Sequence, residues 1–163
     1  MMIINNEVQK PDDATLIIKR MLNAPPELAF KAWTTAEHIK QWMRPEPGME
    51  VPLASMDLRV GGKFRIQMKT ADGEFFTAVG LFKEVKAPER LVYTWDYEQD
   101  GSGAEFGEVE GKTSLITVEF LKRGNQTEFV LTHSRVATVE SRDNHARGWG
   151  KIVEGFAGFV EKE

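Results

Sequence analysis

The chain has no cysteine among its 163 residues, which excludes a disulfide framework, thiol catalysis and thiolate metal sites. Histidine is scarce too: His38, His133 and His145 are the three present, and no two have the spacing of a helical metal-ligand pair. No run reaches the ~18 apolar residues of a membrane-spanning helix, and residues 1–14 lack the pattern of a signal peptide. The sequence therefore predicts no metal site, no membrane span and a cytoplasmic location.

An excess of charge of one sign is also lacking. The chain carries 21 basic and 25 acidic residues, a net charge of −4, which leaves no basic footprint for nucleic acid. Apolar residues make up 41% and charged residues 28%, values typical of a globular protein rather than a disordered one. We expect a flexible N-terminal lead-in over residues 1–13 and one domain over residues 14–163.

Alternation of apolar and polar residues predicts a series of strands. The expected strands are Thr15–Leu22, Met56–Val60, Lys63–Lys69, Phe75–Val85, Leu91–Trp95, Thr113–Leu121 and Thr127–His133. Gly61-Gly62 signals a tight turn or bulge. The acidic segment between Trp95 and Lys112 is predicted as a solvated loop, which could also serve as a lid.

Helices are expected on either side of these strands. Two short ones follow the first strand, the first starting at Pro25-Pro26, where missing N–H groups are tolerated, and the second ending before Pro45. A long C-terminal helix begins near Ser141, its predicted N-cap, with apolar residues three and four positions apart. This order predicts an α+β fold in which a curved antiparallel sheet of about six or seven strands surrounds the last helix.

The aromatic residues have two interpretations. Ten Phe, four Trp and two Tyr are present, and many fall at inward positions of the expected elements. They could fill the core, or they could line a small-molecule cavity between the sheet and the last helix. The candidate lining residues are Trp33, Trp42, Phe64, Phe82, Tyr93, Trp95, Phe120, His133, Trp149 and Phe156.

Catalytic signals are weak, since the chain has no serine-nucleophile motif. His133 is the titratable candidate on the expected inner face, where it could act as a base with Tyr93 as a hydrogen-bond donor. Its alternative role is a structural hydrogen bond near the start of the last helix. Arg65 is a weaker polar handle, because alternation places it opposite Phe64.

Several segments of the chain together carry a family resemblance. They are APPELAFKAWTT at 24–35 with Trp42 and Pro45, DLRVGGKFR at 57–65, GLFKEV at 80–85, PERLVYTW at 88–95, and Gly148-Trp149. These segments resemble the activator of heat-shock protein 90 ATPase homologue family, of the START/Bet v 1-like superfamily. The resemblance spans about residues 14–162 and implies a helix-grip fold with an apolar cavity. The superfamily includes lipid and hormone carriers, polyketide cyclases, oxygenase domains and a co-chaperone domain.

Three functions follow as hypotheses. The first is a domain that binds a small apolar or aromatic ligand without a cofactor. The second is a cyclase- or dehydratase-like enzyme that uses His133 and Tyr93. The third is a stress-related interaction protein, either with the chaperone partner that the family name implies or as a homodimer using an exposed apolar patch.

Overall fold

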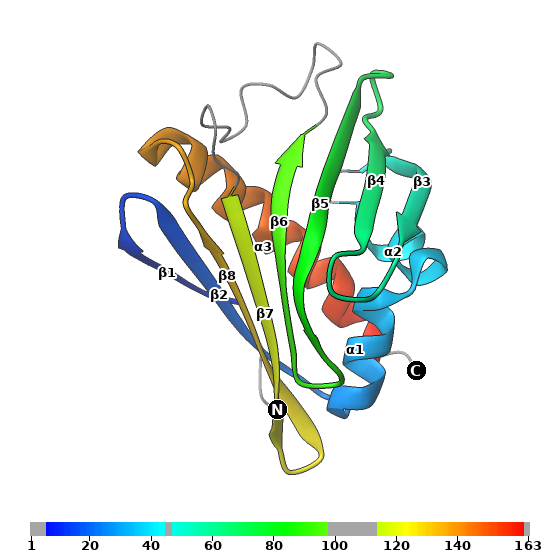
Figure 1. Ribbon diagram of the computed structural model, residues 1–163, viewed down its shortest axis with the longest axis vertical. Helices are drawn as coiled ribbons and strands as arrows, with labels where there is room; N and C mark the ends of the chain where they lie inside the picture. Colours follow the sequence, from blue (N-terminus) through cyan, green and yellow to red (C-terminus); the bar gives the residue numbers. More distant parts are fainter. Residues whose placement is uncertain (1–5, 45–46, 98–113, 162–163) are drawn as a thin grey trace.

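Eight antiparallel strands form one curved sheet in the computed structural model, which describes residues 6–44, 47–97 and 114–161 (Figure 1). Their order across the sheet is β1-β2-β8-β7-β6-β5-β4-β3. The bounds are β1 Glu7–Asp12, β2 Thr15–Leu22, β3 Glu50–Met56, β4 Lys63–Lys69, β5 Phe75–Lys86, β6 Arg90–Tyr97, β7 Ser114–Arg123 and β8 Gln126–Ser134. The predicted α+β helix-grip class is confirmed, with eight described strands instead of six or seven.

The additional strand comes from the expected lead-in. Residues Glu7–Asp12 form β1 and pair with β2, with Glu7 opposite Lys19 and Val8 opposite Ile18. All but one of the residues of β1 are exposed, as is usual for an edge strand. The lead-in prediction was therefore wrong for these residues, because a strand exposed on both faces carries no hydrophobic alternation.

A second correction concerns the strand expected at Met56–Val60. Strand β3 ends at Met56, and residues 57–62 form a turn in which Gly61 has φ 84°. A Cβ at Gly62 would lie 2.0 Å from the Asp57 carbonyl oxygen, so only glycine fits there. The two glycines thus shape a longer connection than the tight turn predicted.

Three helices pack on the concave side of the sheet. Helices α1 (Pro26–Thr34) and α2 (Ala36–Trp42) connect β2 to β3, and α3 (Val139–Glu161) runs diagonally across the sheet (Figure 1). The Thr138 hydroxyl accepts a hydrogen bond from the Ser141 backbone N–H at 3.0 Å, so Thr138, rather than Ser141, caps α3. None of the described helices combines the length and apolar character that a membrane span requires.

The inward positions predicted by alternation form the core. The buried residues at these positions are Phe82, Tyr93, Trp95, Ile116, Val118, Phe120, Phe129, Leu131 and His133. At the centre, the Trp33 ring lies 4.8 Å from Trp42, 5.1 Å from Phe129 and 4.9 Å from Phe156, measured between ring centroids. Such contacts are worth ~0.5–1.5 kcal/mol per pair beyond the area they bury. Aromatic rings therefore fill the space beneath α1 and α2.

The predicted acidic loop, from residue 98 onward, and Pro45 lie outside the described residues.

Candidate functional site

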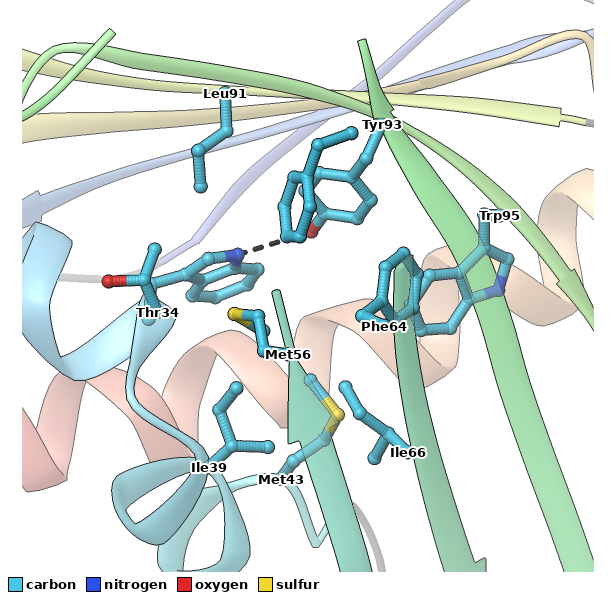
Figure 2. Close-up of a pocket in the computed structure, with 11 residues that line it drawn as sticks. Thr34, Ile39, Met43, Met56, Phe64, Ile66, Leu91, Tyr93 and Trp95 are labelled. Atoms are coloured by element: carbon cyan, nitrogen blue, oxygen red, sulfur yellow. Dashed lines mark hydrogen bonds between the residues drawn. The ribbon is translucent and has the colours of Figure 1, made fainter. Parts of the chain in front are cut away.

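The centre of the fold holds one very small cavity. Its volume is about 10 Å³, close to the minimum for one water molecule. Figure 2 shows its aromatic and aliphatic walls and the hydrogen bond from the Trp33 indole N–H to the Tyr93 hydroxyl, which is 3.1 Å long. This cavity is too small for an organic ligand.

A larger pocket, of about 320 Å³, lies between the first half of α3 and strands β4, β5 and β6. Its volume falls at the lower end of the ~300–1,000 Å³ typical of ligand pockets. Those of its lining residues that the structure describes carry no formal charge when His145 is neutral. They are Met49, Met68, Thr70, Phe76, Trp95, Tyr97, Asn144, His145, Gly148, Trp149 and Ile152.

Helix α3 supplies one wall of this pocket through its regular spacing. His145, Gly148, Trp149 and Ile152 stand at positions i, i+3, i+4 and i+7, which places them along one helix face. Apart from its own helix, a Cβ at Gly148 would meet no atom of the described residues within 4 Å, so the glycine leaves open space in front of the helix.

The polar corner of the pocket is a directed chain of hydrogen bonds. The Trp95 indole N–H donates to the Tyr97 hydroxyl oxygen at 3.1 Å, and that hydroxyl lies 3.1 Å from His145 Nε2. On the other side of the ring, Nδ1 lies 2.9 Å from the Ser141 carbonyl oxygen. Because a carbonyl can only accept, His145 carries its proton on Nδ1, and Nε2 accepts the proton of Tyr97.

Burial keeps both members of this corner neutral. Burial lowers the pKa of His145, and the hydrogen bond to the Ser141 carbonyl opposes this effect only in part. Burial, together with the nearby charge of Asp96, raises the pKa of Tyr97 to about 12, against the hydrogen bond from Trp95. The corner is therefore a neutral imidazole and a neutral phenol at physiological pH.

A second chain fixes the two tryptophans of the pocket wall. The Trp149 indole N–H donates to His133 Nδ1 at 3.0 Å, so the ring proton of His133 is on Nε2 and is donated to the Ser114 hydroxyl at 2.8 Å. That hydroxyl donates to the Trp95 carbonyl at 2.7 Å. Burial holds the pKa of His133 well below its usual value, with the nearby His145 as a smaller cause. His133, on β8, thus links Trp149 of α3 to Ser114 of β7 and, through it, to Trp95 of β6, behind the pocket wall.

The predicted ligand-binding residues occupy three different environments. Trp95 and Trp149 line the 320 Å³ pocket. Trp33, Phe64, Phe82, Tyr93 and again Trp95 line the 10 Å³ cavity. Trp42, Phe120, His133 and Phe156 are packed in the core, away from the described lining of both. Arg65 lies on β4 between the buried Phe64 and Ile66, on the opposite face of the strand.

Sequence reasoning missed most of the pocket. Met68 and Phe76 continue the inward alternation of Phe64 and Phe82, and Tyr97 continues that of Tyr93 and Trp95. The helical spacing from His145 to Ile152 was also readable in the sequence. Asn144, Thr70 and Met49 follow no such periodicity, so only the folded chain identifies them.

Comparisons with known proteins agree on family and fold. The family described as Activator of Hsp90 ATPase homolog 1-like protein matches residues 23–161. Similar solved structures include a protein from Chromobacterium violaceum with 21% identity and a TM-score of 0.79, covering 92% of this chain and 99% of that one. An AHSA1-like protein from Aeromonas hydrophila has 24% identity and a TM-score of 0.70, covering 90% and 92%. An uncharacterised protein from Rhizobium leguminosarum has 26% identity and a TM-score of 0.73, covering 99% and 100%. No curated protein matches the chain.

Proposed function

The chain belongs to the Activator of Hsp90 ATPase homolog 1-like family, and from this premise we propose that it binds a small, largely apolar or aromatic molecule. The pocket between α3 and strands β4–β6 carries the proposal. Its volume of about 320 Å³ suits a compact organic molecule, and the described part of its wall is apolar except for a few polar groups. The fold alone would not support this function, because related folds host different activities.

The expected affinity follows from the apolar surface area of the ligand that the pocket would remove from water. A bicyclic aromatic molecule burying about 200 Å² would gain about 5 kcal/mol. Association costs offset part of this gain. Since a gain of about 5 kcal/mol corresponds to a Kd of about 0.2 mM before these costs, a bare aromatic molecule should bind in the millimolar range, and a natural ligand with matched polar groups should bind more tightly.

The first experiment is native mass spectrometry of freshly purified protein. We expect an additional mass that survives gentle ionisation and can be extracted into organic solvent. If the protein carries no such mass, titration with 2-naphthol, naphthalene and 2-methoxynaphthalene provides the second measurement. Failure of all three to bind would overturn the proposal.

Two glycines of α3 offer a matched pair of variants. Gly148 faces the pocket, whereas Gly158 lies exposed outside its described lining, and a Cβ at either position would meet no atom within 4 Å. Gly148→Leu and Gly158→Leu should each raise helix propensity by nearly 1 kcal/mol. Only Gly148→Leu fills the pocket, so it alone should weaken 2-naphthol binding, by about tenfold or more. Equal binding by the two variants would place the ligand elsewhere.

A second candidate function is the cyclase- or dehydratase-like enzyme. His145 and Tyr97 support it better than His133 and Tyr93, because they stand on the wall of the larger pocket and share a hydrogen bond of 3.1 Å. A neutral imidazole next to a phenol can exchange a proton with a bound substrate. Its test is turnover of whatever molecule co-purifies with the protein, compared between the wild type and His145→Phe.

A further inference from the structure

We propose that the pocket selects molecules that carry a hydroxyl or N–H group, which donates its proton to the Tyr97–His145 corner. This inference rests on the proposed function and specifies the class of its ligand. It derives from the direction of the hydrogen-bond chain.

The Ser141 carbonyl sets that direction. It accepts a hydrogen bond of 2.9 Å from Nδ1–H of His145, which holds the single ring proton on Nδ1 and leaves Nε2 as an acceptor. The Tyr97 proton then points to Nε2 at 3.1 Å, while the Tyr97 oxygen accepts the Trp95 N–H at 3.1 Å. The groups that the corner presents to a ligand are therefore an oxygen and a nitrogen that accept protons.

A ligand donor can join this chain in two ways. Its hydroxyl can donate to the Tyr97 oxygen, or it can displace Tyr97 and donate directly to His145 Nε2. An ether or carbonyl oxygen in the same place would meet lone pairs instead of protons. His145 is 7% exposed and Tyr97 is partly buried, so little water is available to satisfy a polar group of the ligand that finds no partner here.

The other polar groups of the pocket discriminate less. The Thr70 hydroxyl oxygen already accepts the Glu74 backbone N–H at 3.1 Å, and the Asn144 side-chain oxygen accepts a hydrogen bond from Arg147. Asn144 is exposed, so water can satisfy its amide whether or not a ligand does. Discrimination should therefore arise at the buried corner.

The test is calorimetric titration of the full chain with three probes of similar shape near neutral pH. 2-Naphthol has a donor, 2-methoxynaphthalene has only an acceptor, and naphthalene has neither. We expect 2-naphthol to bind about fivefold more tightly than either of the others, although it is the most water-soluble. If all three bind equally, this inference fails while the proposed function stands. If none binds, the proposed function fails as well.

His145→Phe supplies the control. It keeps a flat ring but removes the acceptor, so the Tyr97 proton becomes available to the ligand and the preference for 2-naphthol over 2-methoxynaphthalene should disappear. A thermal melt verifies that this variant folds. If it does not fold, Tyr97→Phe replaces it. This variant lacks the hydroxyl that donates to His145 Nε2, so Nε2 can accept the proton of the ligand, and the preference for 2-naphthol should persist or grow. Loss of the preference in Tyr97→Phe, or its persistence in a folded His145→Phe, would contradict the assignment.

Discussion

Replacing His133 by glutamine tests whether the buried imidazole is neutral in the native protein. His133 is completely buried, and its two nitrogens lie 3.0 Å from the Trp149 indole nitrogen and 2.8 Å from the Ser114 oxygen. A second ring proton would have to form on Nδ1, where it would face the N–H of Trp149. Protonation therefore breaks a buried hydrogen bond and leaves a charge without solvent.

The consequence for stability follows from proton linkage. A histidine in the unfolded chain titrates near pH 6.5, whereas burial holds the pKa of folded His133 well below that value. Between these two values the unfolded chain binds more protons, so the free energy of unfolding falls as the pH falls. The contribution is fully present well above pH 6.5, and roughly 1 kcal/mol of it is lost between about pH 7.5 and about pH 5.5. Burial lowers the pKa of His145 too, which adds a loss in the same direction.

Urea unfolding of the wild type and His133→Gln at these two pH values measures the effect. Glutamine offers one acceptor for Trp149 and one donor for Ser114, but it does not titrate. The pH-dependent loss should be roughly 1 kcal/mol smaller in His133→Gln than in the wild type, and the loss that His145 contributes should remain. An equal loss in the two proteins would refute the assignment of a neutral, doubly hydrogen-bonded His133.

Three further substitutions test the packing that surrounds the site. Gly80→Ala would place a Cβ 1.9 Å from the Thr94 carbonyl oxygen and should lower the free energy of unfolding by about 1–3 kcal/mol. Gly148→Ala, which meets nothing within 4 Å, should raise it by up to about 1 kcal/mol. The same sign for both in urea unfolding would contradict the close approach at Gly80. Tyr93→Phe removes the acceptor of the buried Trp33 N–H, 3.1 Å away, and should cost about 1–3 kcal/mol while leaving 2-naphthol affinity unchanged. A loss of 2-naphthol binding without a loss of stability would instead make Tyr93 a ligand contact.

Much of the fold was readable from local patterns. The alternation around Tyr93, Phe120 and Phe129 predicted which side of each strand faces the core, and the spacing from Trp149 to Val160 predicted the buried face of α3. These patterns are readable because the side-chain direction repeats every two residues in a strand and every 3.6 in a helix. Strand β1 escaped prediction because its exposed residues leave no such record.

The location of the pocket depended on tertiary packing. The sequence predicted an aromatic-lined cavity, but Trp33 and Trp42, delivered by two short helices, fill the space that the sheet and α3 would otherwise enclose. The larger pocket lies beyond them, where Gly148 faces the ends of β4–β6.

The sequence by itself determined the fold class, the family and most of the inward-facing residues. Only the tertiary structure decided that His133 is a structural link and that His145 meets Tyr97, 48 residues earlier in the chain. The physical reason is that free volume and hydrogen-bond partners depend on how distant elements meet. Periodicity records which face of an element is buried, but it does not record what that face is buried against.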